Sequence, residues 1–244
     1  MTSHINIDEV NWKRLFHAYG LATDTPMHLH NLLCSDFKRR DIALNHLFSA
    51  TLHQGTIYSV TPIVVKVLIG ILDAPALRED MYNFYYKRNK VNLERTKAKL
   101  NNPNTRSGLD KMLYHRQLAL EIQLATVKTT TALETILTFI GLVAKSLFHC
   151  EKPDKIEIPC QKELDAFFDN VNEDDDSFWT SPLLDVLTKQ AIWDLFTISH
   201  DVYEKILPYS SDINTDIKKQ AIFATEKWST ITAKFPQANG GILC

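Results

Sequence analysis

Residues 61–72 read TPIVVKVLIGIL, and this stretch decides the fold class. Thr61 is a suitable N-cap, and Pro62 fits the first helical position, where no backbone N–H is required. The apolar residues that follow recur at the spacing of one buried helix face, namely Ile63, Val64, Val67, Leu68, Ile71 and Leu72. The stretch therefore predicts a helix packed into a core.

Similar helical patterns extend to both ends of the chain. Ser181 and Pro182 repeat the start signal, and an apolar stripe runs from there until Pro208 stops it. A third stripe begins near Ser211, with Ile213, Ile217, Ala221, Ala224, Trp228 and Ile231 at steps of three and four residues. Strict alternation of apolar and polar residues is absent, so we predict an all-α protein with essentially no sheet.

The remaining segments also suit helices. We expect short helices at about residues 24–33 and after Ser35, and a long polar helix over residues 78–100. Residues 101–108 form the clearest turn, and residues 109–149 read as two helices breaking near residues 129–131, or as one long bent helix. The chain of 244 residues has only 7 glycines and 9 prolines, fewer than the turns of a β-sandwich or β-barrel require.

Compartment and membrane association follow from simple features. The four cysteines, Cys34, Cys150, Cys160 and Cys244, form no C-x-x-C pair and read as reduced thiols. Residues 1–20 contain no apolar signal segment, and the most apolar run, residues 136–144, is well below the roughly 20 residues of a membrane-spanning helix. We expect a cytoplasmic protein that does not associate with membranes.

The spacing of small and charged residues points to repeated helix pairs. The second helix of a HEAT repeat carries Asp, then a basic residue, then Ala three positions on and an apolar residue four further. Asp36, Arg40, Ala43 and Leu47 fit that spacing. Asp212, Lys218 and Ala221 fit it loosely, with Thr225 at the apolar position. The small alanine lets helices approach closely, and the basic residue lies over a turn rich in carbonyls.

Two N-terminal motifs are more specific. The first is Tyr19-Gly20-x-Ala22-x-Asp24-x-Pro26, and the second is His53-Gln54-Gly55-x-Ile57-Tyr58-x-x-Thr61-Pro62. Residues 12–73, which contain both, resemble the opening segment of a widespread group of bacterial HEAT-repeat proteins. The resemblance implies a HEAT-like α-solenoid of stacked antiparallel helix pairs. We expect one such domain over residues 1–244, with sub-regions 1–77, 78–150 and 151–244.

The resemblance also carries a functional expectation. Members of this group are often non-enzymatic binding proteins, and similar solenoids recur among the immunity proteins of bacterial polymorphic toxins. The chain lacks G-x-x-x-x-G-K-[ST], G-x-G-x-x-G and H-E-x-x-H motifs, which removes support for common nucleotide and metalloprotease chemistry. We therefore expect no enzyme and no cofactor.

His53-Gln54-Gly55 invites a catalytic interpretation, because histidine is the usual acid–base group at neutral pH. A structural role is favoured, because Gly55 falls where the helix after Ser35 must end and a glycine there adopts a left-handed conformation. His53 and Gln54 would then bind the last carbonyl groups. No nearby residues complete a catalytic triad.

The spacing of histidines and cysteines predicts no metal site. His28 and His30 are two positions apart, so on a helix they point to opposite sides, whereas a helical metal pair is four positions apart. His149, Cys150 and Cys160 have a spacing that matches no standard zinc site.

Charge divides the chain into three parts. Residues 1–77 have a net charge of zero, residues 78–150 of +6 and residues 151–244 of −8, which together give the overall −2. The basic part interleaves with tyrosines, a mixture found in nucleic-acid-binding proteins, and its candidate residues are Lys87, Arg88, Lys90, Arg95, Lys97 and Lys99. The favoured alternative is a helix face that packs against the acidic C-terminal third.

The acidic part contains the candidate partner-binding residues, Glu173, Asp174, Asp175, Asp176, Phe178 and Trp179. Four consecutive acids stay solvated unless a basic group meets them, and aromatic residues are enriched at the energetic centres of interfaces. The alternative is an acidic flank that favours the following helix dipole, with Trp179 in the core.

Three functions remain open. The favoured one is a protein-binding module, an immunity protein that covers a toxin domain with its acidic third. The second is a nucleic-acid-binding or DNA-repair protein that uses the basic region, although we do not favour a nucleic-acid partner. The third is a scaffold subunit of a larger assembly, and a hydrolase built from scattered residues ranks below all three.

Overall fold

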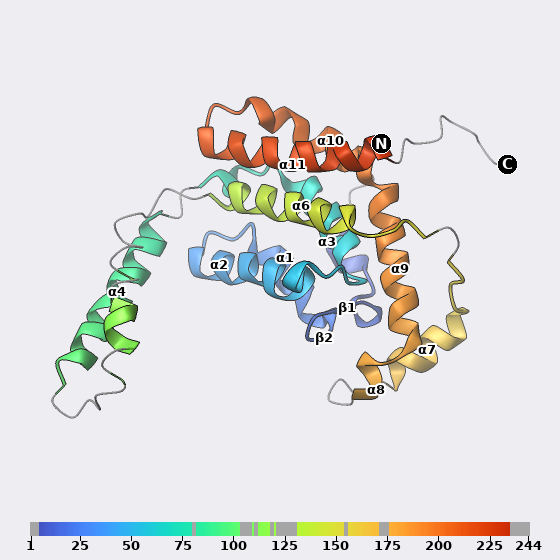
Figure 1. Cartoon of the computed structure of the whole chain (residues 1–244), viewed down its shortest axis with the longest axis horizontal. Helices are drawn as coiled ribbons and strands as arrows, with labels where there is room; N and C mark the ends of the chain where they lie inside the picture. The colour runs from blue at the N-terminus through green and yellow to red at the C-terminus, as the bar shows by residue number, and fades with distance from the viewer. Residues whose placement is uncertain are drawn as a thin grey trace. The chain divides into compact units, whose positions relative to one another are not determined.

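The computed structural model describes residues 5–79, 82–102, 109, 112–117, 120, 131–153, 156–170 and 176–234 (Figure 1). Helices account for 76% of the structure and strands for 3%, which confirms the all-α prediction. The chain divides into two compact units, Met1–Leu77 with Leu133–Cys244, and Arg78–Ala132. This division differs from the single domain that the sequence leads us to expect.

The first unit consists of α-helices of 4 to 20 residues joined by short turns. Its 3-10 turns are η1 (Ile7–Glu9), η2 (Trp12–Arg14), η3 (Ala22–Asp24), η5 (His53–Gly55), η6 (Pro75–Arg78, which reaches the second unit) and η7 (Leu207–Ser211), and η4 (Leu47–Thr51) is a π-helical turn. Its α-helices are α1 (Thr25–Asn31), α2 (Phe37–His46), α3 (Thr61–Ile71), α6 (Ala132–Phe148), α7 (Gln161–Asp169), α8 (Asp176–Trp179), α9 (Pro182–Thr197), α10 (Ser199–Ile206) and α11 (Thr215–Lys234).

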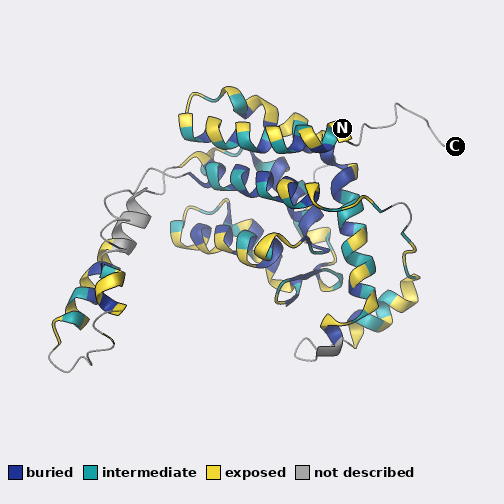
Figure 2. Cartoon of the chain, viewed as in Figure 1, coloured by how far each residue is buried: buried dark blue, intermediate teal, exposed yellow. Residues whose placement is uncertain are grey.

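Helix α6 is largely buried and lies in the centre of the first unit. On one side, Trp228 of α11 donates a hydrogen bond from Nε1 to the carbonyl of Ile140 at 3.1 Å. On the other, the rings of Phe48 and Phe139 meet edge to face with centroids 5.5 Å apart. Figure 1 shows α6 between the pair α10–α11 and the pair α1–α2, and Figure 2 shows the buried positions that line these helices.

The three apolar stripes form helices close to the predicted bounds. Helix α3 begins at Thr61, one position before the predicted start, because Thr61 accepts a hydrogen bond from the Tyr58 amide and donates to the Thr51 carbonyl. Ser181 caps α9 as predicted, with its hydroxyl accepting from the Leu183 amide. The stripe that follows is divided into α9 and α10, because Ile198 has a ψ of 1° and leaves helical geometry. Ile213 precedes α11 and is exposed.

A hairpin of two short strands is the one sheet among the described residues, which agrees with the prediction of essentially no sheet. Strands β1 (Phe16–His17) and β2 (Gly20–Leu21) pair antiparallel, with Gly20 at a φ of 120°. Phe16 also meets Phe178 of α8 edge to face at 6.5 Å, and Arg14 forms an ion pair with Asp165 of α7. These contacts join η2 and the N-terminal hairpin to C-terminal helices that are distant in sequence.

In the second unit, helix α4 (Tyr82–Leu100) confirms a long helix within the predicted range 78–100. Leu93 and Thr96 are buried along it, and residues 112–117 are also helical. The predicted turn at 101–108 and the predicted break at 129–131 lie almost entirely outside the described residues.

Within the residues that the structure describes, none of the helices has the length and apolar character needed to span a membrane.

Candidate functional site

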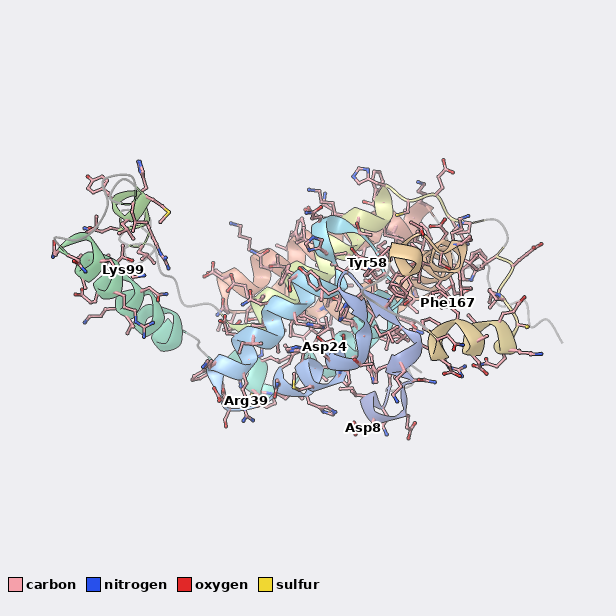
Figure 3. All side chains as sticks on the ribbon, turned by 90° about the horizontal axis from the view of Figure 1, so that it is seen from below. Asp8, Asp24, Arg39, Tyr58, Lys99 and Phe167 are labelled. Atoms are coloured by element: carbon pink, nitrogen blue, oxygen red, sulfur yellow. The ribbon has the colours of Figure 1, made fainter. Side chains whose placement is uncertain are left out.

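Four titratable side chains from four different elements meet in the N-terminal part of the first unit. They are His17 at the end of β1, Asp24 at the end of η3, His28 in α1 and His46 at the end of α2. We call them the histidine cluster. His17 and His46 are buried, whereas Asp24 is exposed, and Figure 3 labels it among the N-terminal elements.

The local backbone explains how these residues converge. Asp24 has helical φ and ψ, so η3 continues into α1, and Asp24 and His28 lie four positions apart on one side of that continuous helix. His46 is the last residue before the π-helical turn η4. Such turns are uncommon and occur frequently at functional sites.

The hydrogen bonds of His17 determine its tautomer. Its Nδ1 accepts from the backbone amide of Tyr19 at 3.1 Å, so the proton of the neutral ring is on Nε2. Nε2 lies 2.9 Å from Asp24 Oδ1 and donates to it. Both ring nitrogens of His17 are therefore used, and His17 fixes the orientation of the Asp24 carboxylate.

His46 lies on the other side of the same carboxylate. Its Nε2 is 3.0 Å from the hydroxyl of Thr25, and its Nδ1 is 3.9 Å from Asp24 Oδ2. The ring of His28 is stacked on the ring of His46, with centroids 4.1 Å apart and planes inclined by 18°. Nδ1 of His28 is buried and has no hydrogen-bond partner among the described residues.

The cluster lowers three pKa values. Burial lowers the pKa of His46 to about 4, and the neighbouring His28 adds to the effect. Burial likewise lowers the pKa of His28. For Asp24, burial acts to raise the pKa, but the hydrogen bond from His17 and the charge of His46 bring it below the ordinary value. At neutral pH Asp24 is therefore a carboxylate, and the rings of His28 and His46 are neutral.

We expect acid to destabilise the protein through His46. The unfolded chain binds a proton near pH 6.5 and the folded chain only near pH 4, so the unfolded state binds more protons between these values. The stabilising contribution is complete above about pH 6.5 and is lost as the pH falls to about 4. Allowing for partial solvent screening, the loss is on the order of 2 kcal/mol. His28 acts in the same direction. The stabilising contribution of Asp24, whose pKa is lowered, is complete above the ordinary pKa of an aspartate and is lost only at lower pH.

The measurement is urea unfolding between pH 7 and pH 4 in an EDTA buffer. His46→Gln removes the titration and should flatten the pH dependence, whereas His30→Gln, an exposed position on the same helix as His28, should leave it in place. Equal slopes in His46→Gln and the unmodified protein would contradict the assignment.

The residues of the predicted acidic site do not share one environment in the structure. Glu173, Asp174 and Asp175 lie outside the described residues, and Asp176 begins α8 without a described side chain. Phe178, predicted to bind a partner, is only 2% exposed because it packs between Phe16 and Phe167. It is a core residue, which corrects the prediction. Trp179 is 41% exposed and does not occupy the core.

A shallow groove of about 530 Å³ is lined by residues that are close in sequence to Trp179. It runs between the start of α7 and the start of α9, and its lining includes Glu157, Ile158, Glu163, Pro182, Leu183 and Val186. Ile158 is 60% exposed. We call the groove lining, together with Trp179 three positions before the lining residue Pro182, the acidic–apolar surface.

The predicted nucleic-acid residues lie on α4. Lys90, Arg95 and Lys99 are exposed and Lys97 is half-buried, while the side chains of Lys87 and Arg88 lie outside the description. Arg95 and Lys99 are four positions apart and share one side of the helix. Lys90 is five positions from Arg95, which places it about 140° around the helix. The cations therefore do not form a single row.

His53-Gln54-Gly55 forms the turn η5 that follows the π-helical turn. Gly55 has a φ of 80° and Gln54 a φ of 52°, both left-handed, and a Cβ on Gly55 would lie 3.2 Å from Ser146 Oγ. His53 Nδ1 is 3.0 Å from the carbonyl of Ser49, as expected of a residue that closes a helix end. Gln54 and Gly55 also line a pocket of about 370 Å³ with Lys145 and His149.

The histidine cluster was missed by sequence reasoning. The irregular positions 17, 24, 28 and 46 match no standard motif, and the two-residue spacing of His28 and His30 points away from a metal site. The four-residue step from Asp24 to His28 is the one signal in the sequence that could have indicated it. In the described part of the chain, the one group of three side chains suited to a metal ion is His17, Asp24 and His46, whose ligand atoms lie within 4.8 Å of one another.

Comparison with known proteins adds no family to these observations: no family model, no curated protein and no solved structure matches the chain.

Proposed function

We propose that the protein is a non-enzymatic binding module that recognises a basic protein through the acidic–apolar surface. The observation that carries the proposal is the exposure of Trp179 and Ile158 in a part of the chain with a net charge of −8. Exposed aromatic and aliphatic side chains supply binding energy at interfaces, and surrounding charge increases the association rate.

The partner that this proposal favours is a bacterial toxin domain, so the protein would act as an immunity protein in the cytoplasm. Support comes from the resemblance of residues 12–73 to bacterial HEAT-repeat proteins. The contacting pairs α1–α2 and α10–α11 fit HEAT-like repeats, and the proposal includes such a solenoid. The negative charges of Glu157 and Glu163 beside the groove suit a partner rich in lysine or arginine, and Glu163 also accepts a hydrogen bond from the Cys160 amide through Oε2.

The nucleic-acid alternative receives less support from the geometry. A duplex-binding surface gathers its cations on one exposed face. On α4, Lys90 lies about 140° around the helix from Arg95, so the described cations are divided between two sides.

We expect Trp179→Ala to weaken binding to the product of the adjacent gene by roughly 30-fold, as befits an aromatic residue that contributes about 2 kcal/mol. Titration calorimetry with the purified pair measures this change. Tyr114→Ala is the matched control, because Tyr114 is 60% exposed and belongs to the second unit. Higher salt should slow association without abolishing the complex. Absence of a complex, together with failure to protect cells from the neighbouring product, would overturn the proposal.

A further inference from the structure

We propose that the histidine cluster is a site for one divalent transition-metal ion, with Asp24, His28 and His46 as ligands and with His17 and Thr25 as the groups that orient them. The inference is independent of the proposed protein partner. It departs from the expectation that the chain holds no metal, because histidines distant in sequence are brought onto one carboxylate.

His46 has the arrangement of a metal-binding histidine. Such a residue usually donates one ring N–H to an oxygen and presents the other nitrogen to the ion. Its Nε2 is 3.0 Å from Thr25 Oγ1, so a proton on Nε2 is satisfied there. The lone pair of Nδ1 is then available to an ion, and Asp24 Oδ2 lies 3.9 Å from that nitrogen. Two ligand atoms about 2 Å from one ion at a tetrahedral angle lie roughly 3.3 Å apart, so Nδ1 and Oδ2 have to approach by about half an ångström to share an ion.

Asp24 supplies the negative charge. The hydrogen bond from His17 Nε2 holds Oδ1, which leaves Oδ2 on the side of His46. Ligating carboxylates are commonly oriented by such a second hydrogen bond. His17 itself is excluded as a ligand in this arrangement, because its Nδ1 accepts the Tyr19 amide and its Nε2 carries the proton given to Asp24.

His28 provides the third ligand. It follows Asp24 by four positions on one continuous helix, the step that places two ligands on the same side. Its Nδ1 is buried without a hydrogen-bond partner among the described residues, which costs free energy unless something binds it. Coordination requires the half-buried ring to turn out of its stack on His46, and the new metal bond satisfies the orphaned nitrogen.

The ligand set selects the class of ion. Two imidazole nitrogens and one carboxylate suit Zn²⁺, Co²⁺ or Ni²⁺, whereas Mg²⁺ and Ca²⁺ prefer oxygen ligands throughout. Because Asp24 is exposed, a coordination position remains open to water.

The test is titration of the EDTA-treated, dialysed full chain with Zn²⁺ by calorimetry and with Co²⁺ by visible absorption. We expect one ion per chain and Co²⁺ bands of a nitrogen–oxygen site. Asp24→Asn and His28→Gln should each weaken Zn²⁺ binding by more than roughly 100-fold, while His17→Gln should weaken it by only about 10- to 100-fold, as expected of an orienting residue. His30→Gln should bind like the unmodified protein, because His30 pairs with Asp8 outside the cluster.

His46→Gln tests the third ligand, and circular dichroism shows whether this buried variant still folds. Asp24 and His28 are more exposed, so their variants keep the test decisive even if His46→Gln unfolds. Absence of stoichiometric Zn²⁺ and Co²⁺ binding overturns the site. Undiminished binding in His28→Gln with complete loss in His17→Gln overturns the ligand assignment.

Discussion

Replacing Trp228 with alanine is expected to lower the free energy of unfolding by about 4 kcal/mol, the range found when a large aromatic side chain is removed from a core. Trp228 is fully buried in α11 and is among the largest enclosed side chains of the described chain. It also donates from Nε1 to the carbonyl of Ile140, so its loss leaves both a cavity and an altered contact with α6. Urea unfolding followed by circular dichroism measures the change.

Trp228→Phe separates the two contributions. Phenylalanine loses the N–H donor but retains most of the apolar volume, so we expect a smaller loss of about 1–2 kcal/mol. A change below about 1 kcal/mol in Trp228→Ala would contradict a packed α6–α11 interface, since a buried aromatic truncation costs several times more.

The second large effect is expected at Gly141 of α6, where α11 lies so close that it leaves no room for a side chain. A Cβ there would lie 2.5 Å from Cε1 of Phe223 and 3.2 Å from Cα of Ala224. The phenylalanine ring can shift, but the backbone of Ala224 cannot without moving the helix. We expect Gly141→Val to lower the free energy of unfolding by about 3 kcal/mol through overpacking.

Gly70→Ala is the matched control, because Gly70 is also helical but exposed. Alanine at an exposed helical position gains up to about 1 kcal/mol of helix propensity, so this variant should become slightly more stable. The opposite signs at the two glycines isolate the effect of packing. Equal stabilisation by both substitutions would show that α6 and α11 are not held at this distance.

The helices were predictable from the sequence because their apolar residues follow the 3.6-residue period. Ile217, Ala221, Ala224, Trp228 and Ile231 form one stripe, and all five are buried in α11. Arg40 likewise lies over the turn that precedes α2, where its guanidinium donates to the carbonyl of Cys34 at 2.5 Å. In each case the prediction depends on residues within a few turns of one another.

The candidate partner surface was predictable only in part. Phe178 and Trp179 are adjacent and both aromatic, so periodicity in a four-residue helix cannot distinguish the one that enters the core. The contact of Phe178 with Phe16 decides the matter, and it joins segments from opposite ends of the chain. The division of the cations of α4 between two sides was, by contrast, already contained in their spacing.

By itself the sequence determined an all-α fold, the helices that carry a buried face and the sign of charge along the chain. These properties follow from the local order of residues, since a helix repeats its face every three or four positions. Only the tertiary structure placed His17, Asp24, His28 and His46 together and divided the chain into two units. The reason is physical: the distances within the cluster depend on how β1, η3, α1 and α2 pack, and that packing is the sum of contacts between residues that no local pattern relates.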